Sequence, residues 1–222
     1  MKPKKQVAGE KAVEFVKSDM TIGLGSGSTV FFAIKKLGEM ITGGLNISAV
    51  PTSLATEALM AEYGVPAVPL RSGMELDLAI DGADEIDPHL NLIKGGGGSL
   101  FREKMVAFSA KRFIVAADNS KSVAVLGKFH VPVEVLPFGW EATADRIRSL
   151  SIAPVLRRRE GNEFITDNGG LILDCDCGEI ADPADLHRKL KLVTGVVETG
   201  LFFDLPVTAV IAGETGISIL NR

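Results

Sequence analysis

The sequence predicts an α/β protein with an open, Rossmann-like parallel sheet flanked by helices and a smaller, ferredoxin-like α+β domain inserted into it. In the first half of the chain, short apolar runs alternate with amphipathic stretches, which is typical of β-loop-α units. From Val131 the expected order changes to strand, helix, strand, strand, helix, strand, the split βαββαβ pattern. The chain of 222 residues, 46% of them apolar, is long enough for one large domain with a smaller one.

The expected elements of the first half follow one another as strand, loop and helix. A helix with apolar residues spaced over 8–16 precedes a buried strand at 21–24, and a glycine loop then leads into a helix that ends at Gly43 and Gly44. Further strands are expected at 46–50, 76–80 and 112–117, and further helices at 53–63 and 99–110.

The second half of the chain is expected to form the smaller domain and then to rejoin the first sheet. We expect strands at 131–136, 153–157, 171–174 and 195–198, and helices at 141–150 and 183–192. Two β-rich segments, 207–212 and 217–220, end the chain and are expected to rejoin the first sheet. We therefore place a larger α/β domain at residues 1–129 and 205–222 and a smaller α+β domain at residues 130–204.

Charge and composition exclude several classes of protein. Lys and Arg number 24 against 28 Asp and Glu, a net charge of −4, and no run of like charges resembles a nucleic-acid footprint. The longest uncharged stretch, 40–56, is too short and too polar to span a bilayer, and the N-terminus lacks a signal-peptide core, so a cytoplasmic protein is expected. Cys175 and Cys177 are too few for a disulfide scaffold and lack the partners of a zinc site.

The first loop of chemical interest is Gly23 to Thr29, between an expected strand and an expected helix. Free N–H groups and the helix dipole at such a position favour an anion, and the hydroxyls of Ser26, Ser28 and Thr29 suit phosphate oxygens. The third glycine of a dinucleotide fingerprint is missing, as is the lysine of a Walker loop. A phosphate site and a tight turn with a hydroxyl cap both fit this loop.

The second loop, Asp81 to Asp87, places four acids in seven positions after an apolar strand. In solvent these carboxylates are only a polar turn. If they converge in a closed pocket, repulsion and desolvation raise pKa values toward the range useful for acid and base catalysis. Carboxylates also bind divalent cations, so three interpretations stay open for this loop.

The third loop runs from Lys94 through four consecutive glycines to Ser99. Four glycines cost conformational entropy, so a closely approached backbone explains them better than chance. Glu103 lies about one turn into the following helix, where an acid also stabilises the helix dipole by only ~0.3 to 1 kcal/mol. Because all three loops are assigned to strands of one parallel sheet, we expect them to meet at its carboxyl edge. Such a site suits proton transfer on a small phosphorylated substrate.

Several segments, in order, resemble the signature segments of ribose-5-phosphate isomerase type A. They are GLGSGST (23–29), DGADEID (81–87), KGGGGSLFREK (94–104) and ADNSK (117–121), with further matches at 126–140, 166–174 and 194–203. The resemblance covers nearly the whole chain. It implies interconversion of ribose 5-phosphate and ribulose 5-phosphate in the larger domain, without a metal or another cofactor, by a homo-oligomer (dimer or tetramer). From charge and composition we expect no nucleic-acid or membrane partner.

The resemblance also implies the site residues. Glu103 is the expected base, with Asp81, Asp84 and Lys94 as further catalytic groups. The expected substrate-binding residues are Ser26, Gly27, Ser28, Thr29, Asp81, Gly82, Ala83, Asp84, Lys94, Gly95, Gly96, Gly97 and Lys121. Lys5 is a candidate second cation for the phosphate.

Two other functions are compatible with such loops. A sugar-phosphate sensor of a transcription regulator would need a DNA-binding module, and no basic helix-turn-helix segment precedes residue 20. A metal-dependent sugar-phosphate isomerase or epimerase would lose its activity on chelation, whereas the metal-free reaction would not.

Overall fold

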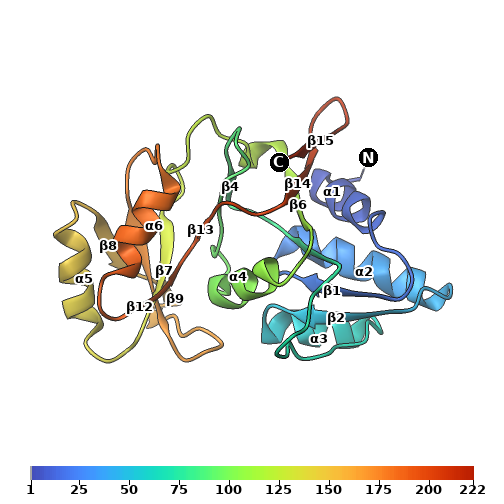
Figure 1. Ribbon diagram of the computed structural model, residues 1–222, viewed down its shortest axis with the longest axis horizontal. Coiled ribbons are helices and arrows are strands. Elements are labelled where there is room, and N and C mark those ends of the chain that lie inside the picture. Colours follow the sequence, from blue (N-terminus) through green and yellow to red (C-terminus); the bar gives the residue numbers. More distant parts are fainter. Residues whose placement is uncertain (1) are drawn as a thin grey trace. The chain divides into compact units, whose positions relative to one another are not determined.

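A computed structural model describes residues 2–222, and the chain divides into two compact units (Figure 1). The first unit comprises residues 2–83, 102–122 and 205–222, and the second comprises residues 84–101 and 123–204. The sequence-based division differs from this grouping, because residues 84–101 and 123–129 pack with the second unit. That the α/β and α+β parts are separate domains stays a prediction.

The first unit contains a six-stranded sheet in the order β15-β14-β6-β3-β1-β2. Its strands are β1 (Met20–Leu24), β2 (Ile47–Pro51), β3 (Leu78–Asp81), β6 (Phe113–Asp118), β14 (Val207–Ala212) and β15 (Ile217–Asn221). All neighbours pair in parallel except β15, which runs antiparallel to β14 at the edge. The predicted open parallel sheet is confirmed, and both C-terminal β segments rejoin it.

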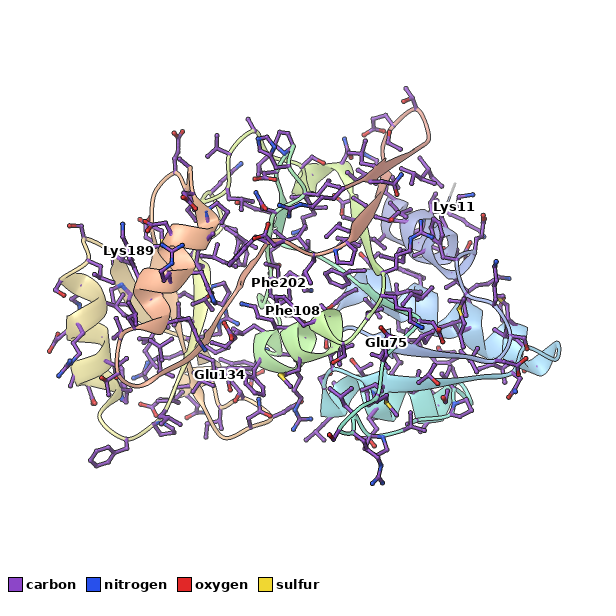
Figure 2. The ribbon with its side chains drawn as sticks, viewed as in Figure 1. Lys11, Glu75, Phe108, Glu134, Lys189 and Phe202 are labelled. Carbon is purple, nitrogen blue, oxygen red and sulfur yellow. The ribbon has the colours of Figure 1, made fainter. Side chains whose placement is uncertain are left out.

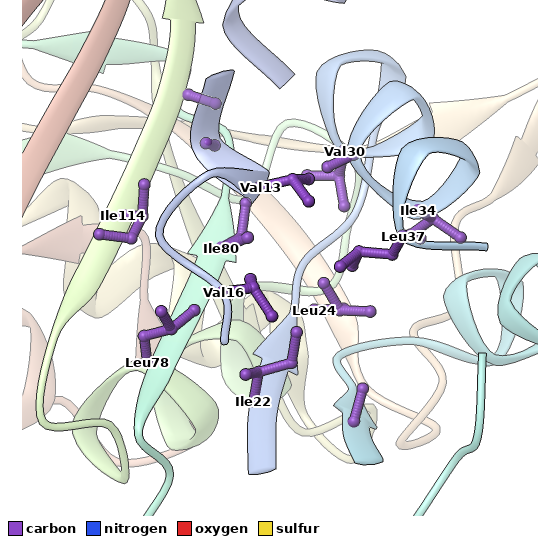
Figure 3. Close-up of a cluster of buried hydrophobic side chains, with 14 of the residues drawn as sticks. Val13, Val16, Ile22, Leu24, Val30, Ile34, Leu37, Leu78, Ile80 and Ile114 are labelled. Carbon is purple, nitrogen blue, oxygen red and sulfur yellow. The ribbon is translucent and has the colours of Figure 1, made fainter. Parts of the chain in front are cut away.

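Helices cover both faces of this sheet. One face packs against α1 (Lys4–Val13), α2 (Ser28–Thr42) and α3 (Leu54–Glu62). Figure 3 shows this core, in which Leu24 of β1 lies beside Leu37 of α2 and Ile22 lies on the same face of the sheet. Gly23 therefore faces the opposite side, because side chains alternate along a strand. There Val106 of α4 (Leu100–Phe108) packs so closely that a Cβ on Gly23 would lie 2.2 Å from its Cγ1.

The second unit contains a four-stranded antiparallel sheet in the order β12-β7-β11-β8. The strands are β7 (Val131–Val135), β8 (Ala153–Leu156), β11 (Leu171–Asp176) and β12 (Val196–Thr199), and the helices are α5 (Trp140–Arg148) and α6 (Pro183–Lys191). Apolar residues of both helices pack in one core with Val131, Val133 and Val135, so the helices share one face. This is the predicted ferredoxin-like pattern.

Short elements in the second unit were not predicted. β4 (Glu85–Ile86), β5 (Leu92–Ile93) and β13 (Leu201–Phe202) form a three-stranded sheet, and β9 (Arg158–Arg159) pairs with β10 (Asn162–Glu163). Two-residue strands carry no periodic signal. The expectation that all three loops follow strands of the parallel sheet was therefore wrong, because the Lys94 loop follows β5. No helix within residues 2–222 is long and apolar enough to cross a bilayer.

Candidate active site

The loop from Gly25 to Gly27 joins β1 to α2 at the carboxyl edge of the parallel sheet. Its strand lies between β2 and β3, where the chain changes the direction in which it adds strands. Open α/β sheets bind ligands at such a switch point. Gly27 has a φ of 97°, a conformation that favours glycine, and it precedes Ser28, the first residue of α2. The first N–H groups of α2 therefore lie at the position expected for an anion site.

Asp81 holds this loop from the end of the neighbouring strand β3. Its side chain is only 2% exposed, and its Oδ1 accepts hydrogen bonds from the backbone N–H groups of Ser26 at 3.2 Å and Gly82 at 2.7 Å. A Cβ on Gly25 would lie 1.9 Å from the same oxygen. Glycine is therefore required at position 25 because the Asp81 carboxylate occupies the space of a side chain.

A cluster of hydroxyls surrounds Ser26. Its Oγ lies 3.1 Å from Oγ1 of Thr52, 3.0 Å from Oγ of Ser53 and 3.2 Å from Oγ1 of Thr56. Thr56 also donates to the carbonyl oxygen of Gly25 at 2.8 Å. The three partners were not among the predicted site residues. Their position after β2, the neighbour of β1, was the signal that could have identified them.

Two cations, Lys5 and Lys121, lie near the Asp118 carboxylate at the end of β6. Nζ of Lys5 donates to Oγ of Ser28 at 3.0 Å, and Lys121 ends the short 3₁₀ helix η1 (Asn119–Lys121) after β6. Partial burial raises the pKa of Asp118, whereas two hydrogen bonds from Ser120 lower it. The charges of Lys5 and Lys121 lower it further, and the net result is a pKa below the ordinary value. Both ammonium groups therefore lie within electrostatic range of the Asp118 carboxylate. That Lys5 adds a second cation for a phosphate stays a prediction.

Glu103 lies in the first turn of α4 and is 5% exposed. It shares a helix face with Val106, three residues later, which contacts the sheet at Gly23. The other end of α4 meets the amino edge of the sheet, because the N–H of Leu76 donates to the carbonyl oxygen of Ser109 at 2.7 Å. Glu103 therefore lies toward the carboxyl edge, one turn beyond the contact with β1.

Lys94 belongs to the second unit and is 2% exposed. It directly follows β5, and its backbone N–H donates to the carbonyl oxygen of Gly200 at 2.8 Å. Its Nζ lies 5.4 Å from the ring centroid of Phe202, which Figure 2 labels. A buried ammonium at this distance from an aromatic ring is stabilised by the ring's negative face.

Different features of the structure explain why glycine occupies each position after Lys94. Gly95 and Gly98 both have a φ of 97°. A Cβ on Gly96 would lie 2.6 Å from Oδ1 of Asp84, whose Oδ2 accepts the N–H of Gly96 at 2.8 Å. Gly97 is exposed, and a Cβ there would meet no atom within 4 Å. The predicted close approach is thus made by protein atoms at Gly96, whereas the space at Gly97 is open.

The acids of the second loop divide into two groups. Glu85 accepts the N–H groups of Gly127 and Phe129 at 2.8 and 2.6 Å, and Asp87 likewise caps the turn that follows it. Glu85 and Asp87 therefore stabilise the local backbone, and the assignment of Asp81 and Asp84 to the site stays a prediction. Within residues 2–222, no three His, Cys, Asp or Glu side chains are grouped so that they could hold a metal ion.

The structure distributes the predicted site residues between the two units. The first unit carries Ser26, Gly27, Ser28, Thr29, Asp81, Gly82, Ala83, Glu103 and Lys121, and the second carries Asp84, Lys94, Gly95, Gly96 and Gly97. Arg157, which donates to two carbonyls of the glycine segment, was not predicted. A single arginine at the end of a strand gives no signal in the sequence.

Comparison with known proteins identifies the family of this chain. The sequence model of the family "Ribose 5-phosphate isomerase A (phosphoriboisomerase A)" matches residues 48–216. A ribose-5-phosphate isomerase A of Bacillus mycoides is 51% identical over 96% of this chain and 97% of the relative. The solved structure of ribose 5-phosphate isomerase A from Methanocaldococcus jannaschii has a TM-score of 0.94 at 36% identity and covers 99% of this chain and 98% of its own. A D-ribose-5-phosphate isomerase in complex with phospho-erythronic acid has a TM-score of 0.94 at 38% identity, with the same coverage. The chain therefore belongs to the ribose-5-phosphate isomerase A family of aldose-ketose isomerases.

Proposed function

We propose that this protein interconverts D-ribose 5-phosphate and D-ribulose 5-phosphate by proton transfer through an enediolate, with Glu103 as the base. Membership of the family supports the reaction, which belongs to the non-oxidative pentose phosphate pathway. The observation that carries the mechanism is the buried carboxylate of Glu103, on the face of α4 that packs on β1 and toward the carboxyl edge of the sheet.

The reaction balances with one carboxylate and no oxidant. Once the sugar ring is open, Glu103 removes the proton from C2, and the electrons of that bond pass through C1 to the carbonyl oxygen O1. A proton moves from O2 to O1 in the enediolate. Glu103 then returns its proton to C1, and a carbonyl forms at C2. One carboxylate can serve both steps, because it accepts the proton from C2 as a base and donates it to C1 as an acid.

The phosphate is assigned to the start of α2. The hydroxyls and backbone N–H groups of Ser26 to Thr29, together with Lys121 and Lys5, would bind it through charge and hydrogen bonds. A phosphate remote from C1 and C2 contributes mainly uniform binding energy, which lowers KM more than it raises kcat.

The remaining assignments follow the matched motifs. Lys94 would stabilise the negative oxygen of the enediolate, Asp81 would move protons during ring opening, and Asp84 would hold a substrate hydroxyl. The backbone of Gly82, Ala83 and Gly95 to Gly97 would contact the sugar. Because phospho-erythronic acid is bound by a solved relative, we propose that it competes with ribose 5-phosphate for this site.

The decisive variant is Glu103→Gln, which keeps size and hydrogen bonding but removes the proton acceptor. The expected loss in kcat is at least ~10²- to 10⁴-fold. Glu57→Gln is the matched control, because Glu57 is also a first-turn acid of a helix in the first unit but is exposed. Activity of Glu103→Gln within a few-fold of the control would remove Glu103 from the role of base.

The same assay tests the requirement for a metal. Proton transfer by a carboxylate needs neither a hydride acceptor nor a Lewis acid, so turnover of ribose 5-phosphate should be equal with and without EDTA. Activity that EDTA abolishes and a divalent ion restores would favour a metal-dependent isomerase.

We also propose a homo-oligomer, either a dimer or a tetramer. β15 is an edge strand whose five residues are all exposed, among them Ile217, Ile219 and Leu220. Exposed apolar edge strands are surfaces on which chains associate. Sedimentation equilibrium should give a mass at least twice 23.5 kDa, whereas a monomer mass at all concentrations would contradict this.

A further inference from the structure

Arg157 lies between β8 and β9 and reaches the glycine segment of the same unit. Its Nη1 donates to the carbonyl oxygens of Gly95 at 2.9 Å and Gly96 at 3.1 Å. Its Nε donates to Oδ2 of Asp174 at 2.9 Å, and Nη2 contacts the other carboxylate oxygen. The arginine side chain is 12% exposed. A paired guanidinium with little exposure is thus fixed in place and donates to two consecutive carbonyls.

One peptide unit transmits this contact to Asp84. The carbonyl of Gly95 and the N–H of Gly96 belong to the same planar peptide. The oxygen accepts from Arg157, while the N–H donates to Oδ2 of Asp84 at 2.8 Å. A rotation of this peptide plane would break both hydrogen bonds together. Between two glycines such a rotation meets little steric resistance, so an external group is needed to fix the plane.

The other end of the segment is fixed separately. The ring of Phe164 occupies the side-chain space of Gly98, since a Cβ there would lie 2.3 Å from the ring. The same ring lies 5.9 Å from Cζ of Arg157. Arg157 and Phe164, more than fifty positions away in the sequence, therefore hold both ends of Gly95–Gly98.

We propose that Arg157 is a positioning residue for the isomerase reaction: it fixes the Gly95–Gly96 peptide plane and, through it, the Asp84 carboxylate. The inference rests on the proposed function, in which Asp84 contacts the substrate. Asp174 orients the guanidinium. Arginine is required because a lysine has one ammonium and cannot donate to both carbonyls while remaining paired with the carboxylate in this geometry.

A double-mutant cycle tests this route of action. Arg157→Ala should lower kcat about 10- to 100-fold with KM changed only a few-fold, since a misplaced group costs catalysis without loss of folding. In the Asp84→Asn background the same change should cost less than about 3-fold, because the group that Arg157 positions is already absent. Equal losses in the two backgrounds would overturn the inference.

The matched control is Arg159→Ala. Cζ of Arg159 lies 4.6 Å from the same Phe164 ring, so this variant removes an equal charge beside the same aromatic group. It should keep the parent kcat. A loss equal to that of Arg157→Ala would show an effect of charge or of Phe164 and would contradict positioning through the peptide. Circular dichroism melting confirms that each variant is folded at the assay temperature. If Arg157→Ala is unfolded, Asp174→Asn takes its place in the cycle with a smaller loss in the same direction.

A readout without substrate separates this inference from the proposed function. The Gly96 amide should be protected from hydrogen exchange in the parent and in Arg159→Ala, and should exchange at least about 10-fold faster in Arg157→Ala. A parent without isomerase activity would contradict the proposed function but leave this measurement decisive. Unchanged exchange at Gly96 in Arg157→Ala would overturn the inference.

Discussion

The two glycine loops of this protein are held by the same device in different surroundings. In each, an aspartate accepts a backbone N–H of the loop and occupies the space of a glycine side chain. Asp81 does this for Ser26 and Gly25, and Asp84 does it for Gly96. Asp81 is 2% exposed at the end of a strand in the parallel sheet, whereas Asp84 is partly exposed and follows that strand.

The difference teaches which supports of a loop can be predicted from the sequence. The first loop lies between a strand and a helix of the sheet, and its support comes from the neighbouring strands. The glycine loop after Lys94 follows a two-residue strand and depends on Arg157 and Phe164, which come from the ferredoxin-like part of the chain. Adjacent strands support such loops in open α/β sheets generally. Support from one distant side chain depends on the tertiary packing of the individual protein.

Alanine substitutions of Gly25 and Gly96, the two glycines that face an aspartate, should show the largest difference in stability between the loops. Gly25→Ala places a Cβ 1.9 Å from a buried carboxylate oxygen that cannot move, and overpacking of this kind should cost about 2 to 3 kcal/mol in the free energy of unfolding. Gly96→Ala places its Cβ 2.6 Å from Asp84, which can rotate toward solvent, so about 1 kcal/mol is expected. Urea denaturation measures both, and a larger cost for Gly96→Ala would contradict the account.

Lys121→Ala tests whether the first loop binds the phosphate. KM for ribose 5-phosphate should rise about 10-fold with kcat within a few-fold, because the charge supplies uniform binding energy. The sharper control is D-ribose, which lacks the phosphate: kcat/KM for D-ribose should be unaffected. An equal loss on both sugars would place Lys121 away from the phosphate.

Gly97→Ala should give the smallest effect and tests the open part of the glycine loop after Lys94. A Cβ at Gly97 meets no protein atom within 4 Å, so the urea midpoint should match that of the parent. If the sugar approaches the backbone here, KM should rise a few-fold while stability is unchanged. A fall in stability would mean that Gly97 is needed for the fold and not for the approach of the sugar.

The sequence predicted the parts of the fold that carry periodic signals. Periodic apolar residues can be recognised in one sequence. They predicted the strands of the parallel sheet, the helices beside it and the βαββαβ order of the second unit. The three-stranded sheet of β4, β5 and β13 was missed because two-residue strands have no period. In the candidate site, motifs indicated Glu103 and Lys94. Arg157 was not indicated, because only tertiary packing brings it to the glycine segment, whereas the hydroxyls of Thr52 and Thr56 could have been identified from their position after β2.

The most direct test of the account follows the hydrogen at C2. Ribose 5-phosphate carrying deuterium at C2 is converted in ordinary water, and the mixture is held at equilibrium through many turnovers before analysis by NMR. If a carboxylate holds the proton between the two steps, solvent exchanges it, and deuterium should disappear progressively from both sugars. A site that excludes water slows this loss without preventing it. Deuterium retained in full, moving only between C2 of the aldose and C1 of the ketose, would show a direct hydride shift and would contradict proton transfer by Glu103.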